Sequence, residues 1–115
     1  MINYVIILTV VATLAIGQLL FKTVGLRLGD KGFLTLLHDR QTLMIFLTSL
    51  ALYGVATFGW IWGLRQVPLS TAYLFMSLGF VLVPLAAYLV FGEPISTRFI
   101  LGTALIIIGI VVAAG

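Results

Sequence analysis

A few polar side chains interrupt an otherwise apolar sequence, and their spacing makes them the first candidates for a binding site. Gln18 and Lys22 are four residues apart, so both lie on one face if their segment is helical. Ser70, Tyr73 and Ser77 share a second face, because steps of three, four and seven residues return to the same side of a helix. A polar side chain inside a membrane-spanning helix is costly and is therefore a functional hypothesis by default. Two such faces could meet around a cavity that binds a polar ligand.

Each of these residues also has a purely structural explanation. Gln18 and the serines could hydrogen-bond to a neighbouring helix or to the backbone one turn earlier. Lys22 could extend its ammonium group to the membrane surface while its methylene groups stay in lipid. Trp62 is expected to anchor its helix at the membrane surface, whereas Trp60 could either anchor or stack on a ligand. The sequence leaves these alternatives open.

No group of residues suits catalysis, metal binding or cofactor binding. His38 has no partner at metal-ligand spacing, no nucleophile has a base at a suitable distance along the chain, and cysteine is absent. Asp30, Asp39 and Glu93 all lie outside the interiors of the apolar segments. An antiporter that exchanges a cation for protons needs a desolvated carboxylate inside the membrane, and none is present. We therefore expect no enzyme, no cofactor and no antiporter of this kind.

The composition predicts the kind of fold that must position these residues. Of the 115 residues 63% are hydrophobic and 8% are charged, and the mean hydropathy of +1.30 is too high for a water-soluble domain. A membrane-spanning helix needs about 20 mostly apolar residues, so the length accommodates four spans with short connections. The prediction is an all-α integral membrane protein, a four-transmembrane-helix bundle that forms one domain over residues 1–115. The expected spans are about 3–24, 43–64, 68–91 and 95–114.

The connections between these spans have their own signals. Phe33, Leu34 and Leu37 alternate with charged residues over a stretch too short to cross a bilayer, which predicts a short helix at the membrane surface between the first two spans. Pro68 and Pro94 are expected in the first turns of the helices that follow them. Pro84 is expected to kink the third span, because proline removes one backbone hydrogen bond.

The basic residues predict the orientation. Only Arg65 lies at the side of the second connection, whereas five basic residues belong to the side of the first and third connections. These five are Lys22, Arg27, Lys31, Arg40 and Arg98. The positive-inside rule places the first and third connections in the cytoplasm and both termini outside. The net charge of +3 therefore serves topology and contact with membrane lipids, and no nucleic-acid partner is expected.

Small residues at helical spacing predict where helices pack closely, since the hydrophobic effect drives little association between helices in lipid. The stripes are Thr9, Thr13 and Gly17; Gly59 and Gly63; Ala72, Gly79 and Ala86; and Gly102, Gly109 and Ala113. The first three are expected to pack within the chain. The fourth, on the last helix, is equally suited to packing against a second chain.

Several short motifs then resemble a known family. They are Gly17 to Lys22 in the first span, Val67 to Tyr73 and Ser77 to Val81 in the third, and Glu93 to Ser96 followed by Gly102 and Gly109. Together they resemble the drug/metabolite transporter superfamily in its four-helix form, and within it the small subunits of the aminoarabinose undecaprenyl-phosphate flippase. The resemblance covers nearly the whole chain and keeps the motifs in the same order.

The resemblance implies a function and partners. It implies that the chain moves a polyprenyl-phosphate-linked sugar from the cytoplasmic to the outer leaflet of the bacterial inner membrane, for modification of lipid A. It also implies a homodimer or a heterodimer with a sister four-helix subunit.

The same resemblance implies roles for the candidate site residues. A phosphate needs cations and hydroxyls, which Lys22, Arg27, Tyr73 and Ser77 could supply beside Gln18 and Trp60. Glu93 could pair with a sugar amine or, alternatively, favour the start of the fourth helix through the helix dipole.

Two other functions remain open. The small multidrug resistance group shares the Gly17 to Lys22 spacing, the Ala72 and Tyr73 pair and the glycine-rich fourth helix. However, its essential acidic residue falls on Leu14 in this sequence, and its characteristic tryptophan falls near Met76. An exporter of small cationic or amphipathic molecules is therefore one alternative, and an accessory membrane subunit is the other.

Overall fold

The computed structural model describes all 115 residues and is all-helical. Its elements are α1 (Ile2–Leu28), η1 (Gly29–Leu34), α2 (Thr35–His38), α3 (Arg40–Leu64), α4 (Leu69–Met76), α5 (Gly79–Phe91) and α6 (Thr97–Ala114). Four helical segments are long and apolar enough to cross a membrane, with α4 and α5 together forming the third. The predicted all-α membrane fold with four spans is confirmed.

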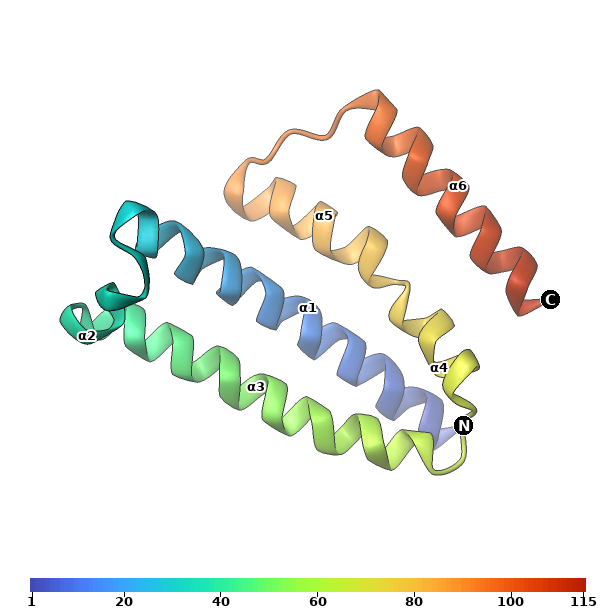
Figure 1. Cartoon of the computed structure of the whole chain (residues 1–115). Coiled ribbons are helices and arrows are strands. Elements are labelled where there is room, and N and C mark those ends of the chain that lie inside the picture. The colour runs from blue at the N-terminus through green and yellow to red at the C-terminus, as the bar shows by residue number, and fades with distance from the viewer.

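The spans lie side by side in the order α3, α1, α4 with α5, and α6 (Figure 1). The Cα atoms extend over 50 × 37 × 18 Å, so the array is flat. The most extensive helix contact is between α1 and α3, whereas α6 meets the other helices mainly along α4 and has no buried residue. Both termini lie at the end of the array that carries the α3–α4 connection (Figure 1).

The helix boundaries differ from the predictions where a capping residue decides them. Helix α3 begins at Arg40, because the Asp39 side chain accepts a hydrogen bond from the Gln41 backbone N–H. Helix α6 begins at Thr97, because the Ser96 hydroxyl accepts a hydrogen bond from the Phe99 N–H at 3.0 Å.

The positions predicted for the two prolines at the helix starts also differ from the structure by one or more residues. Pro94 lies in the extended connection before α6 and not in its first turn, so that prediction is wrong. Pro68 occupies the N-cap of α4, one residue before the predicted first turn.

The third span is interrupted at Ser77 and Leu78, not at Pro84, which α5 contains without a break. The N–H groups of Ser77 and Leu78 donate to carbonyls three residues back, at 3.3 Å and 3.1 Å, as in a 3₁₀ turn. The Ser77 hydroxyl also donates to the Leu74 carbonyl, and this kind of bond bends helices. The interruption is therefore marked by the Ser77 hydroxyl, which competes for a backbone carbonyl about two turns before the proline.

The first connection contains η1 and α2, and three of its apolar side chains are strongly exposed. Phe33, Leu34 and Leu37 have exposed fractions of 72%, 66% and 78%. That this segment lies at the membrane surface remains a prediction, which the exposure of these side chains favours.

Glycines hold α1 and α3 together. A Cβ added at Gly63 would lie 2.7 Å from Cγ1 of Ile7, and one added at Gly59 would lie 2.9 Å from Cγ2 of Val10. A Cβ at Gly17 would meet the ring of Tyr53. These small-residue positions therefore pack within the chain as predicted, since only glycine allows this close an approach.

The glycines of the other helices lie in open space. A Cβ added at Gly79, Gly102 or Gly109 would meet nothing within 4 Å. Gly102 and Gly109 on α6 therefore have no partner inside the chain. The prediction that the third stripe packs within the chain holds at the fully buried Ala72 and is wrong at Gly79.

This contrast predicts different effects of one substitution at two glycines. Gly63→Ala should lower the free energy of unfolding by about 1–3 kcal/mol, because its methyl group overpacks the fully buried Ile7. Gly109→Ala should be neutral or stabilising, because alanine is the better helix former. Unfolding by sodium dodecyl sulfate from mixed micelles, followed by circular dichroism, measures both. Equal effects of the two substitutions would contradict the packing described.

Candidate functional site

A cavity of about 360 Å³ lies between α1 and the third span. Leu14 and Gln18 line it from α1, and Tyr73, Ser77 and Gly79 line it from the other side. The cavity is mainly apolar, with a small number of polar groups, which is typical of a site that orients a ligand. Three of the residues proposed from the sequence, Gln18, Tyr73 and Ser77, thus face the same space.

Gln18 also makes the hydrogen bond between helices that was its structural alternative. Its Nε2 group donates to the hydroxyl of Tyr53 on α3 at 2.5 Å. The ring of Tyr53 stacks on Phe21, with 4.8 Å between ring centroids. Tyr53 therefore fixes the side chain of Gln18 at the edge of the cavity. Sequence reasoning did not assign Tyr53 this role, because the pairing depends on the relative rotation of two helices.

Lys22 and Glu93 form an ion pair at the end of the same helix face. The Lys22 Nζ atom lies 3.3 Å from Oε2 of Glu93, and the two side chains are 49% and 44% exposed. Gly92 ends α5 in the left-handed conformation, with φ 68° and ψ 23°, and Glu93 follows it directly. Since Ser96 caps α6, the alternative role of Glu93 at the start of that helix is not realised.

This ion pair can exchange its partners with a ligand. A half-exposed pair contributes little to stability, so it opens at small cost. A ligand that carries one anionic and one cationic group could replace each charge by its own and leave neither Lys22 nor Glu93 unpaired. Glu93 also borders a cavity of about 250 Å³ beside Pro84 and Pro94, which gives a ligand room to approach.

The structure does not bring Arg27 to this cavity. The Arg27 Nη1 atom lies 3.3 Å from Oε1 of Gln41 and 3.9 Å from Oδ2 of Asp39, at the start of α3. Arg27 therefore ties the end of α1 to the start of α3 and borders a polar hollow formed by the first connection.

The structure places Trp60 and Trp62 differently. Trp60 packs edge-on against the ring of Tyr73, with 6.0 Å between centroids, beside the buried Ile7, Val67 and Ala72. It therefore supports Tyr73 from outside the cavity. Trp62 is exposed, and the guanidinium of Arg65 lies 4.0 Å from its ring centroid, as suits a residue at the membrane surface.

Asp39 is a polar residue whose role sequence reasoning missed. The Thr42 hydroxyl donates to its Oδ2 atom at 2.7 Å, and the Gln41 N–H donates to its Oδ1 atom at 3.1 Å. The hydrogen bond from Thr42, the N–H of Gln41 and the charge of Arg27 hold the pKa of Asp39 below its usual value. The signal was available, because aspartate directly before an apolar helical run is a typical N-cap.

These features define a multi-pass membrane protein with a few binding groups at cavities between its helices. A family model described as the EamA-like transporter family matches residues 1–115. The chain therefore belongs to the EamA-like transporter family. No solved structure matches this chain.

Curated relatives carry a more specific name. The chain is 38% identical over 108 residues to the probable 4-amino-4-deoxy-L-arabinose-phosphoundecaprenol flippase subunit ArnE of Yersinia pseudotuberculosis serotype O:1b, covering 94% of this chain and 92% of the relative. It is 43% identical over 67 residues to a protein of the same name from Enterobacter sp. (strain 638), covering 58% of this chain and 63% of the relative. The latter match thus spans less than two thirds of its relative.

The contacts of Asp39 predict a pH dependence of stability. Because its pKa is lowered by folding, Asp39 stabilises the fold above its unfolded pKa of about 3.9, and this contribution is lost as the pH falls through the folded value. Asp39→Ala should lower the melting temperature at neutral pH and flatten its fall below pH ~4. Thermal unfolding in detergent between neutral and acidic pH measures both effects. Asp30→Ala, in the same connection, is the control, and identical profiles for the two variants would exclude the proposed cap.

Proposed function

We propose that the chain is one subunit of a flippase that moves an undecaprenyl-phosphate-linked amino sugar, of the 4-amino-4-deoxy-arabinose type, across the bacterial inner membrane. The names of the relatives support this substrate class. The observation that carries the proposal is the ion pair between Lys22 and Glu93. The substrate has a phosphate and an amine, so it carries the same two kinds of charge as the pair.

In this mechanism, the substrate separates Lys22 from Glu93 and binds to both side chains. Lys22 binds the phosphate, and Glu93 binds the ammonium group of the sugar, each by a charge-assisted hydrogen bond. This exchange leaves neither charge unpaired at the reduced dielectric of the membrane, where an unpaired charge would be costly. The pair therefore recognises a ligand with two opposite charges and discriminates against lipids with a phosphate alone.

The neighbouring polar groups would bind the sugar. Gln18, one turn before Lys22 on α1, lines the cavity together with Tyr73 and Ser77. The Ser77 hydroxyl donates to the Leu74 carbonyl, so it offers its lone pairs to a sugar hydroxyl. Leu14 lines the same cavity, so the position where related multidrug exporters carry their acid is apolar here. This favours the flippase over the proton-coupled exporter.

The orientation of this site follows from the basic residues. The Lys22 end of α1 carries the first connection, and the positive-inside rule assigns that side to the cytoplasm. The resemblance stated above implies that lipid-linked sugars of this class start from the cytoplasmic leaflet. The ion pair would therefore receive the substrate before it crosses the membrane.

Function requires a second chain, because a flat array of helices cannot surround a sugar. The free stripe on α6 is suited to this contact, in a homodimer or in a heterodimer with a sister subunit. We expect Gly109→Cys to form cross-linked dimers in native membranes. Gly63→Cys, whose position packs against Ile7, is the control and should not cross-link. Only monomers, at expression levels that support transport, would count against this assembly.

The role of Lys22 is tested in liposomes that contain the purified protein and a defined undecaprenyl-phosphate amino sugar. Lys22→Met should reduce transport more than a hundredfold, because one contact of a cation with a phosphate at reduced dielectric is worth a few kcal/mol. Lys22→Arg should keep part of the activity, since the charge remains. Lys31→Met, in the exposed first connection, should transport nearly as the wild type does. Wild-type transport by Lys22→Met would exclude Lys22 as the phosphate ligand.

A charge exchange separates binding from structural support. If the pair only tethers α5 to α1, the double variant Lys22→Glu with Glu93→Lys should transport normally. If each residue binds its own part of the substrate, the double variant should fold but remain inactive.

An imposed pH gradient should not drive accumulation of the substrate in the same liposomes, because no carboxylate lies inside a span. Accumulation of the substrate against its own gradient would contradict this.

A further inference from the structure

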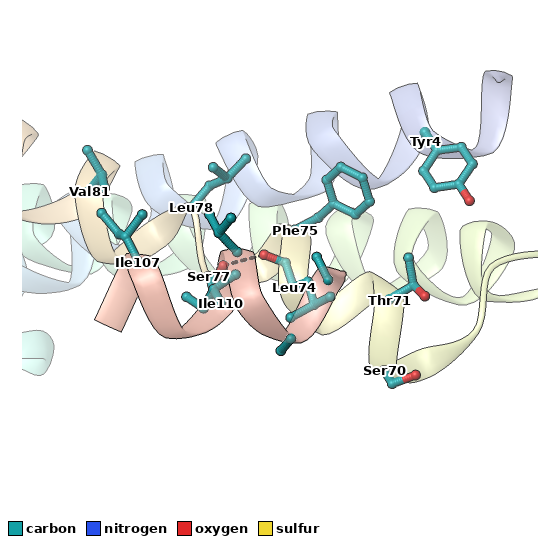
Figure 2. Close-up of a pocket in the computed structure, with 13 residues that line it drawn as sticks. Tyr4, Ser70, Thr71, Leu74, Phe75, Ser77, Leu78, Val81, Ile107 and Ile110 are labelled. Atoms are coloured by element: carbon teal, nitrogen blue, oxygen red, sulfur yellow. Dashed lines mark hydrogen bonds between the residues drawn. The ribbon is translucent and has the colours of Figure 1, made fainter. Parts of the chain in front are cut away.

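A second and larger cavity lies between the third span and α6 (Figure 2). This groove has a volume of about 640 Å³, and ten of its thirteen lining residues are hydrophobic. Branched aliphatic side chains such as Val81, Ile107 and Ile110 form one end and the middle of it. Because α6 meets the other helices mainly along α4, the groove is not closed by a further helix of the chain.

The other end of the groove carries three hydroxyl groups. Tyr4, Ser70 and Thr71 lie there together, at the end opposite Val81 and Ile107 (Figure 2). None of the three side chains makes a hydrogen bond within the chain. By contrast, Thr9 donates to the backbone carbonyl four residues earlier at 2.8 Å, as do several other threonines. The hydroxyls of the groove are thus free to bind a ligand, and no charged residue lines it.

The hydroxyl end of the groove and the Lys22–Glu93 pair lie at opposite ends of the molecule. Tyr4 and Lys22 are 18 residues apart along α1, which at about 1.5 Å per residue is about 27 Å. This is nearly the thickness of the hydrocarbon core of a bilayer, about 30 Å. Ser77 lines both the groove and the Gln18 cavity, so the two spaces meet at the interruption of the third span.

We propose that the groove is a second lipid site, which holds the polyprenyl-linked sugar after it has crossed the membrane. The isoprenoid chain lies along the aliphatic residues, and the phosphate and the sugar lie at the end of the groove that carries the hydroxyls of Tyr4, Ser70 and Thr71. This inference rests on the proposed function and adds a site at the opposite leaflet. Since the groove offers no charge, it binds the lipid less tightly than the ion pair does, which favours release.

The shape of the groove favours this occupant over a second protein chain. An apolar length with hydroxyl groups at one end matches a lipid whose head group carries hydroxyls. In the stripe on α6, Gly102 and Gly109 do not line the groove, and only Ala113 borders it. A second chain at the two glycines therefore leaves Ile107, Ile110 and Ala114 to the lipid.

The test uses photo-crosslinking in liposomes that contain the full-length protein. The probe is an undecaprenyl-phosphate amino sugar with a diazirine on its isoprenoid chain, and phosphatidylglycerol with a diazirine on one acyl chain is the comparison. The polyprenyl probe should label the segment from Ile107 to Ala114 more strongly than the phospholipid does. Ala114→Phe, which fills the groove and lies outside the Gly102, Gly109 and Ala113 stripe, should reduce this labelling about tenfold, equivalent to about 1.4 kcal/mol. Ala104→Phe, on the same helix but outside the groove lining, should leave it unchanged.

The role of the hydroxyls is tested without filling the groove. Ser70→Ala combined with Thr71→Val keeps the shape of the groove and should weaken labelling by the polyprenyl probe only. Thr48→Val, whose hydroxyl donates to the Met44 carbonyl on α3, is the control.

The outcomes separate this site from the proposed function. If Lys22→Met stops transport while Ala114→Phe changes neither labelling nor transport, the flippase stands and the groove site is wrong. Equal labelling by the two probes would also overturn the site, because the groove would then hold bulk lipid. A loss of dimers in Ala114→Phe without a loss of labelling would assign the groove to a second chain instead.

Discussion

Close approach of backbones at glycine is the interaction on which the rest of this structure depends. In lipid the hydrophobic effect does not press helices together, so they associate where small residues allow van der Waals contact or where polar groups meet. Helices α1 and α3 satisfy this requirement through Gly17, Gly59 and Gly63, and they form the most extensive contact in the chain. Helix α6 has comparable glycines but no partner for them, so it lies at the edge of the array.

Polar contacts then fix the relative heights of the helices. They occur at three levels: Asn3 with Gln66 at one end, Gln18 with Tyr53 further along, and two charged contacts at the other end. Each of the three levels joins α1 to α3 or to a residue beside one end of α3, whereas only the Lys22–Glu93 pair joins α1 to the end of α5. The firmest unit is therefore α1 with α3. The third span packs against both helices around the buried Ala72 at its α4 end, and at its α5 end it is held by an ion pair that a charged ligand can replace.

The sequence was sufficient for those features that depend on one helix at a time. Hydropathy located all four spans, and small-residue spacing identified Gly59 and Gly63 as packing positions. Helical spacing also placed Gln18 and Lys22 on one face. It could not pair Lys22 with Glu93, since that contact depends on how α5 lies against α1 and on the turn at Gly92. The interruption at Ser77 was missed because proline is the stronger general signal, although here the serine hydroxyl competes for the backbone.

An open array suits the transfer of a lipid better than a closed bundle does. In the proposed function, the polyprenyl chain stays in an apolar environment while the charged head group crosses, so a closed ring of helices would have to exclude one of the two. A flat array completed by a second chain would let the head group move along the polar side chains of α1 and the third span, while the polyprenyl chain stays at the lipid-facing edge beside α6. The weak attachment of α6 is then an advantage, because a helix held by few contacts can separate from α4 at low cost and admit the lipid from the side. The glycine contacts are thus concentrated between α1 and α3, which they hold together, and α6 at the opposite edge is left free to separate from α4.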